Sequence, residues 1–290
     1  MEAKGHKYKL YIAGLEFYMM ACFDLLDKNV PVRVDQKTGP CHSKSIEIKS
    51  IDDLQTVLQT VLKNRTAAST KMNLGSKDHA GSSRSHAALI LRLYQVDKES
   101  KFQKSEFHLI DLAGAERPDK VGVERVSAYD IMTKLMTQKN AKIGVAEQGF
   151  LINYELSELH TLCVNATDAH KKGKPFKVAT SLTPPGIQYV AQLINGSCIM
   201  NMIICLSQAP QNGWETWFSL KYGTDLSKLE IKIPKQKPTD FKKYLAQVTK
   251  EDAEFAKKAD PKAPVTVATP VHKDNYAKSQ FLLSVLKSLE

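Results

Sequence analysis

The chain has 290 residues, of which 42% are hydrophobic, so it is long enough for one large domain with an appendage. Its formal net charge of +10 favours an acidic partner, such as nucleic acid, an anionic membrane or an acidic protein surface. No apolar run approaches the roughly 20 residues of a membrane span. The five cysteines form no C-x-x-C pair, and the histidines lack zinc-ligand spacing. We therefore expect a reducing compartment, the cytoplasm, and no structural metal.

The first quarter of the chain predicts short strands followed by one helix. Residues 7–14, 31–34 and 45–49 are strand candidates, and 16–26 is ambiguous between strand and helix. Ser50 then caps a helix, with Asp53 three positions on, as in a capping box. Apolar residues at helical spacing follow, which we expect in the core: Leu54, Val57, Leu58, Val61 and Leu62.

Strands and helices alternate from residue 87 to residue 229. The apolar runs 87–94 and 107–112 predict central strands covered on both faces, and 198–206 predicts a third buried strand. Helices are expected over 128–135, 149–164, 187–194 and 214–229. This alternation predicts a layered α/β domain. We place that domain at residues 1–230.

Composition changes at about residue 231. Residues 231–290 contain five of the twelve prolines, and 12 lysines against 7 acidic residues. We expect an extended basic appendage with short helices over 241–258 and 276–289. No heptad pattern runs long enough for a stable coiled coil.

Two short motifs carry the most information. Residues 81–86 read G-S-S-R-S-H, and residues 108–117 read H-L-I-D-L-A-G-A-E-R. This pair resembles the switch I and switch II motifs of the kinesin motor domain family. The resemblance extends in the family's order from about Tyr8 to Leu229, and includes the L-E-F-Y run at 15–18. Gly149, Ile152, Asn153 and Leu156 match the family's G-x-x-I-N-x-S-L pattern, in which this chain has Glu155 at the serine position. The resemblance implies the layered α/β/α fold of a P-loop NTPase and a microtubule partner.

One departure from the family concerns the phosphate-binding loop. No G-x-x-x-x-G-K-[ST] pattern occurs in the 290 residues. We therefore expect a kinesin-like fold that lacks its first strands and P-loop. In the family the P-loop strand lies inside the sheet, between the strands that match 107–112 and 198–206, so its absence would leave strand edges unpaired.

The resemblance also implies roles for the retained switch residues. Ser83, with Ser82 beside it, would contact Mg²⁺, and Asp111 would hold the water shell of that ion. Gly114 would donate its backbone N–H to the γ-phosphate. Arg84 and Glu116 would form a salt bridge that closes the switches. Without a P-loop lysine little neutralises a triphosphate, so we expect no cofactor for the lone chain and no independent ATPase.

A basic loop follows the predicted switch II helix. Lys171, Lys172 and Lys174, with Lys177 beyond them, occupy a position that faces tubulin in the family. Asn153 belongs to the start of the same helix. Charge complementarity with acidic tubulin would speed encounter and be sensitive to salt. No nucleic-acid-binding motif accompanies the basic residues, so neither nucleic acid nor membrane is expected as a partner.

Three interpretations of function remain open at this point. The first is a non-catalytic pseudo-motor that binds microtubules or another motor chain on the cytoskeleton. The second is half of a split ATPase, in which another kinesin-like chain supplies the P-loop and Mg-ATP binds the completed site. The third is a protein–protein interaction module that no longer binds microtubules.

Overall fold

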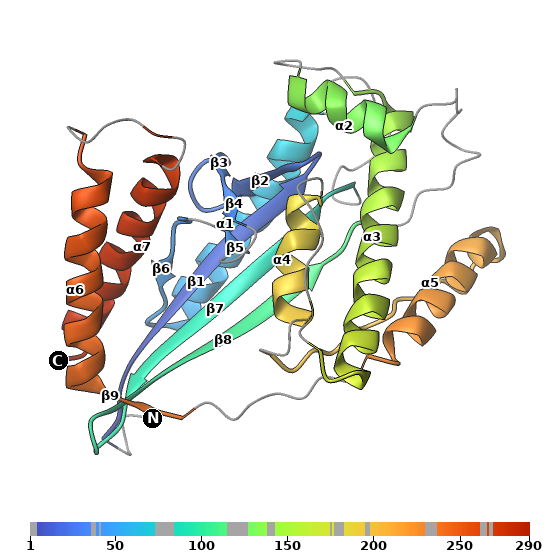
Figure 1. Ribbon diagram of the computed structural model, residues 1–290. Coiled ribbons are helices and arrows are strands. Elements are labelled where there is room, and N and C mark those ends of the chain that lie inside the picture. Colours follow the sequence, from blue (N-terminus) through green and yellow to red (C-terminus); the bar gives the residue numbers. More distant parts are fainter. Residues whose placement is uncertain are drawn as a thin grey trace.

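The computed structural model describes the chain over residues 5–35, 39–40, 42–72, 84–114, 127–137, 143–174, 176, 183–194, 198–229, 237–261, 266 and 269–290. A seven-stranded sheet lies at the centre, with the order β3-β2-β1-β7-β8-β9 and β6 paired to β1 (Figure 1). Each described strand pair is antiparallel. The strands are β1 (Lys7–Tyr18), β2 (Ala21–Asp24), β3 (Val30–Val32), β6 (Ile46–Glu47), β7 (His86–Val96), β8 (Lys101–Asp111) and β9 (Thr239–Asp240).

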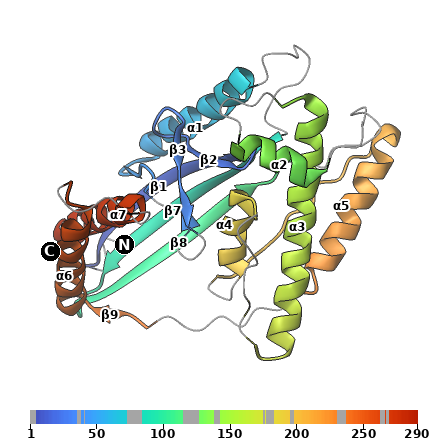
Figure 2. The same cartoon turned by 45° about the horizontal axis from the view of Figure 1, so that its top comes forward.

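Helices cover both faces of this sheet. Helices α3 (Val145–Lys171) and α4 (Pro185–Ile194) lie on one face, and α1 (Ile51–Met72) lies on the other (Figures 1 and 2). Successive side chains of β1 point to opposite faces of the sheet, so β1 contributes to both helical layers. Leu15 packs with α3 and α4, whereas Ile12 packs with α1. The predicted α/β layering is therefore confirmed, in a sheet whose described pairings are antiparallel.

Helix α1 begins at the N-cap that the sequence predicts. Ser50 Oγ accepts the Asp53 N–H at 3.1 Å, and the Asp53 carboxylate accepts the Ser50 N–H at 2.9 Å, which confirms the predicted capping box. Val57 and Val61 are buried against the sheet, but Leu62 is 64% exposed, so its predicted core position is wrong. Gly14 of β1 permits the close approach of α1, because a Cβ there would lie 2.8 Å from Val61 Cγ2.

The ambiguous segment 16–26 proves to be a hairpin. A two-residue turn, Met19-Met20, joins β1 to β2, and both residues have positive φ angles, of 45° and 64°. Such a turn usually contains Asn or Gly, because a side chain in this conformation is strained. Met20 packs beside Ile131 and Met132 of helix α2 (Ala128–Thr137), which lies close to its predicted bounds.

The expected third buried strand is absent. Residues 198–206 run as irregular chain without a described strand partner, and Ile199 and Ile203 are 81% and 86% exposed. Strand β8 also differs from the prediction, since Phe107 and Leu109 are 63% and 55% exposed. The two corrections have different physical reasons. Beyond β8 the described sheet continues only into the short β9, so 198–206 has no described strand to pair with. Phe107 and Leu109 share a face with Leu89 and Leu91, but the apolar cluster under α1 includes only the latter two, so that face of β8 stays uncovered.

Residues after 237 do not form the expected extended appendage. Strand β9 pairs with the first two residues of β8, and α6 (Phe241–Ala259) and α7 (Thr269–Lys287) form a helical hairpin. A continuous apolar cluster joins this hairpin to the end of the sheet, and its buried members are Tyr94, Val96, Phe102, Phe241, Val248, Val285, Leu286 and Leu289. The two predicted helices are confirmed at nearby bounds, but they pack on the sheet and do not extend away from it. Lysines interrupt the apolar positions along each helix, so the sequence did not indicate this packing.

A small antiparallel pair, β4 (Val34–Asp35) with β5 (Gly39–Pro40), lies beside the main sheet. Helix α5 (Gly213–Leu226) packs on α3 and follows a short 3₁₀ turn at Pro210–Asn212. None of the described helices combines the length and the apolar character that a bilayer crossing requires.

Candidate functional site

The pairing of β7 with β8 brings the two switch-like motifs together. The strands are antiparallel, so the start of β7 lies beside the end of β8, and Ala87 faces Asp111. Arg84 and His86 therefore lie next to the loop 112–114. Ser82, Ser83, Glu116 and Lys177 fall outside the described residues. The proposed Mg²⁺ contact of Ser83 and the Arg84–Glu116 salt bridge remain predictions.

Asp111 forms an ion pair with a residue that lies outside both switch-like motifs. Arg65 of α1 places its Nη1 2.6 Å from Asp111 Oδ2 and donates from Nη2 to the Ser85 carbonyl at 2.9 Å. Arg65 is buried, whereas the Asp111 side chain is 71% exposed. A guanidinium thus neutralises the carboxylate that the family resemblance assigns to the Mg²⁺ water shell. An arginine on the buried side of an otherwise apolar helix face was the signal for this pair.

A second buried acid supports the same loops. Ser85 Oγ donates to Glu16 Oε1 at 2.7 Å, and Glu16 is only 1% exposed. Burial raises the pKa of the Glu16 carboxyl, although the bond from Ser85 and the charge of Arg65 act in the opposite direction. Glu16 thus anchors the start of β7 to β1.

His86 connects three elements through its imidazole ring. The Ala113 N–H donates to Nδ1 at 3.0 Å, and Nε2 lies 2.8 Å from Glu155 Oε2 of α3. His86, Ala113 and Glu155 are 2%, 4% and 7% exposed. In the family pattern I-N-x-S-L the position of Glu155 is a serine, so this departure was the available signal for the contact.

Arg84 is directed toward α3. Its Nη1 donates to Gln148 Oε1 at 3.3 Å, and Gln148 in turn donates to the Ile143 carbonyl at 3.2 Å. Both Arg84 and Gln148 are buried. Arg84 therefore ties the start of β7 to the first turn of α3, whereas Gly114 is exposed at the end of the loop. Among the described residues, no group of three acidic, histidine or cysteine side chains could hold a metal ion.

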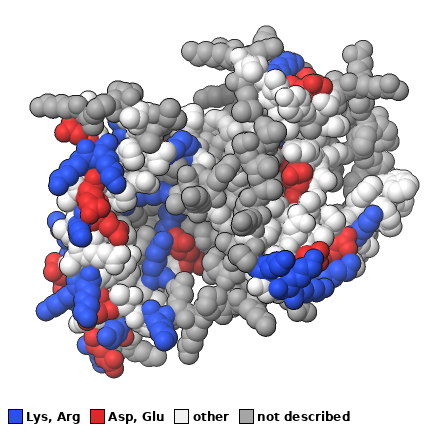
Figure 3. Space-filling model, in the orientation of Figure 1, with Lys and Arg blue, Asp and Glu red and all other residues white. Residues whose placement is uncertain are grey.

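The basic residues form an exposed cluster at the other end of α3. Lys171, Lys172 and Lys174 surround Gly173, whose φ of 62° ends the helix, and the Lys174 N–H donates to the Ala169 carbonyl at 2.9 Å. We call these three residues the lysine cluster. Basic side chains gather in Figure 3 over the lower end of α3, with acidic side chains beside them, and basic and acidic side chains are mixed over α6 and α7.

Asn153 does not lie near the lysine cluster. It occupies the first half of α3, 18 positions before Lys171, which corresponds to about 27 Å along a helix. Its side chain is partly buried. The predicted microtubule-binding residues that the structure describes therefore divide into two separate locations on one helix.

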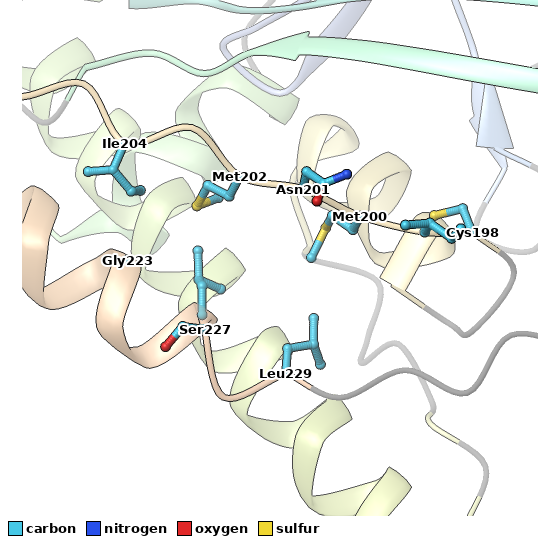
Figure 4. Close-up of a pocket in the computed structure, with 10 residues that line it drawn as sticks. Cys198, Met200, Asn201, Met202, Ile204, Gly223, Ser227 and Leu229 are labelled. Atoms are coloured by element: carbon cyan, nitrogen blue, oxygen red, sulfur yellow. The ribbon is translucent and has the colours of Figure 1, made fainter.

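A hollow and an exposed apolar surface lie beyond β8. The hollow of about 380 Å³ lies between residues 198–204 and the end of α5 (Figure 4). Helix α5 approaches residues 198–204 closely at Gly223, where an added Cβ would lie 2.8 Å from Ile204 Cγ1. Outside the hollow, Trp214, Trp217 and Phe218 are about half exposed and contact one another.

Solved structures with the same fold are motor proteins. A KIF14 dimer in complex with a microtubule and AMP-PNP is 23% identical, with a TM-score of 0.59, and the match covers 79% of this chain and 60% of that chain. The C-terminal motor and motor homology domain of Kar3Vik1 is 21% identical, with a TM-score of 0.56, covering 78% and 53%. The fold is thus a mixed α/β motor-type fold with a mainly antiparallel sheet between helices.

The kinesin motor domain model matches residues 1–229, so the chain belongs to the kinesin motor domain family. Kinesin-like protein KIN-1 of Arabidopsis thaliana is 27% identical over 227 residues, which are 75% of this chain and 42% of the relative. Kinesin heavy chain of Doryteuthis pealeii is 26% identical over 264 residues, covering 87% and 24%. The chain spans less than half the length of these two curated relatives.

Proposed function

We propose that this chain binds microtubules through the lysine cluster and does not hydrolyse ATP on its own. The observation that carries the proposal is the exposure of Lys171, Lys172 and Lys174 at one helix end. No ion pair joins these lysines to any residue within the described ranges. A concentrated positive charge is suited to an acidic filament surface, and a place on the cytoskeleton follows from it.

The non-catalytic part of the proposal is supported by Asp111. Its carboxylate already has a cationic partner in Arg65, so a hydrated Mg²⁺ would have to compete with a buried guanidinium. The 290 residues also contain no P-loop pattern whose amides and lysine would receive a triphosphate. We therefore expect the lone chain to need neither Mg²⁺ nor ATP for its interaction with the filament.

Sedimentation with microtubules tests the proposal. The purified chain should pellet equally with and without Mg-ATP, and the pelleted fraction should fall as salt rises. The variant Lys171→Glu/Lys172→Glu/Lys174→Glu should bind about tenfold more weakly. The matched control Lys250→Glu/Lys257→Glu/Lys258→Glu changes three exposed lysines of α6 and lowers the net charge equally. Equal losses in both variants would contradict a specific role for the lysine cluster.

A split motor is the second candidate, favoured by the exposed apolar residues of β8. Beyond its two-residue pairing with β9, the outer edge of β8 has no described strand partner. Phe107 and Leu109 lie exposed beside that edge. A second kinesin-like chain that added a strand there could also supply a P-loop and complete a Mg-ATP site with Asp111 and Gly114. Release of the lone chain from microtubules by Mg-ATP would contradict both candidates, because neither lets this chain bind nucleotide alone.

A further inference from the structure

We propose that His86 is a positioning residue that couples the loop 112–114 to helix α3 through a single imidazole ring in one fixed tautomer. The inference is independent of microtubule binding, because it concerns only the described core. It gives a role to Glu155, which occupies the position of a serine in the family pattern.

The hydrogen bonds of the ring determine where its proton lies. A backbone N–H can only donate, so His86 Nδ1 must accept the bond from Ala113 and carries no proton. The proton of the neutral ring is then on Nε2, which donates to Glu155 Oε2 at 2.8 Å. Each bond selects the tautomer that the other requires. Loss of the bond to Glu155 should therefore weaken the bond to Ala113, although Glu155 and Ala113 lie on different elements.

Packing fixes the ring as well as its proton. Gly186, in the first turn of α4, lies against it, since a Cβ there would come 3.4 Å from His86 Cδ2 and 3.2 Å from Phe17 Cβ. A ring that cannot rotate transmits a displacement of one partner to the other. Ala113 lies between Asp111 and Gly114, and Glu155 lies on the helix that ends in the lysine cluster. His86 therefore makes the loop and the helix move as one body.

Residue-resolved amide exchange of the full chain tests the coupling. The variant Glu155→Ala should speed exchange of the Ala113 N–H about tenfold, because the ring is free to change its tautomer. Glu155→Gln keeps an oxygen that can accept from Nε2 and should retain wild-type protection. The matched control Thr167→Ala removes a buried hydroxyl of the same helix, whose bond is to the Cys163 carbonyl, and should leave Ala113 unchanged.

Variants of His86 separate the two halves of the link. His86→Asn places an oxygen near the position of Nδ1, so Ala113 should remain protected while the contact with Glu155 is lost. His86→Gln reaches toward Glu155 but leaves the Ala113 N–H without its acceptor, so exchange there should rise. Imidazole nitrogen shifts of the wild-type chain should show a proton on Nε2 alone. A proton on Nδ1, or unchanged exchange at Ala113 in a folded Glu155→Ala variant, would overturn the proposal.

Discussion

Arg33 and Asp274, which are 241 positions apart in sequence, form an ion pair with Nη2 2.6 Å from Oδ2. The pair joins the β3–β4 connection to α7, at the edge of the helical hairpin. Both side chains are about one-third exposed, and ion pairs of this kind contribute roughly 0–1 kcal/mol to stability. The apolar cluster beneath the hairpin must therefore hold it in place.

The contrast between the ion pair and the cluster gives a first prediction. Leu286→Ala removes a side chain that is fully buried between the hairpin and the sheet, and should lower the free energy of unfolding by about 3 kcal/mol. Arg33→Ala should lower it by less than about 1 kcal/mol. Urea unfolding followed by circular dichroism measures both. A larger loss in Arg33→Ala than in Leu286→Ala would show that the ion pair, not the cluster, anchors the hairpin.

The lowered pKa of Glu106 should make the free energy of unfolding depend on pH. Burial alone would raise its pKa, but hydrogen bonds and charges from His108, Lys104 and Arg92 hold it well below the ordinary value. A depressed folded-state pKa means that the stabilisation is present at neutral pH. It is lost as the pH falls below about 4.3, the unfolded value, toward the folded one. Glu106→Gln should therefore cost about 1 kcal/mol at pH 7 and progressively less in acid, as urea unfolding at each pH would measure. An equal cost at pH 7 and pH 3 would contradict this assignment.

The described cysteines should differ sharply in reactivity. Burial raises the pKa of the Cys163 thiol to about 12, so little thiolate forms, and Cys22 is buried as well. Cys205 is exposed on the irregular segment 198–206. Brief alkylation followed by peptide mass spectrometry should label Cys205 at least tenfold faster than Cys163. Slow labelling of Cys205 in the lone chain would mean that this segment is covered in solution.

The edge of β8 beyond β9, which has no strand partner among the described residues, should promote self-association. Exposed apolar residues at the edge of a sheet favour edge-to-edge pairing. Phe107→Lys/Leu109→Lys should raise the monomeric fraction in sedimentation velocity without loss of stability, because both side chains are already exposed. The control Ile110→Lys places a charge on the half-buried neighbour that packs beneath α4, and should destabilise the fold. Unchanged association in the double variant would exclude this edge as the contact.

Local signals in the sequence identified most of the elements. The capping box at Ser50 and the apolar spacing within 149–164 depend only on nearby residues, and these features are confirmed. The Arg84–Glu116 salt bridge that the motif pair implied stays a prediction, and the described contact of Arg84 is with Gln148. The strand predicted over 198–206 failed because a strand requires a neighbour to pair with, and an apolar run contains no information about whether that neighbour exists.

The polar contacts within the site were harder to predict. Arg65, Glu16 and Glu155 lie in three different elements, and only the folded sheet brings them to the switch-like loops. Each is a charged residue on an otherwise apolar face, which indicates that it has a buried polar partner. The sequence does not indicate which residue that partner is. The alternation of the β7–β8 hairpin could likewise not reveal that the Phe107 side is uncovered, because burial depends on which helices pack there.

The turn at Met19-Met20 has a consequence for how the molecule unfolds. Two consecutive non-glycine residues with positive φ cost of order 1–3 kcal/mol each, and Met20 packs against the cluster of Ile131 and Met132 in α2. The tip of the hairpin and α2 are thus thermodynamically linked, since separation of α2 would leave the strain without compensation. Fraying of this corner should be cooperative, with the turn and the helix opening as one subglobal unit below the temperature at which the sheet melts.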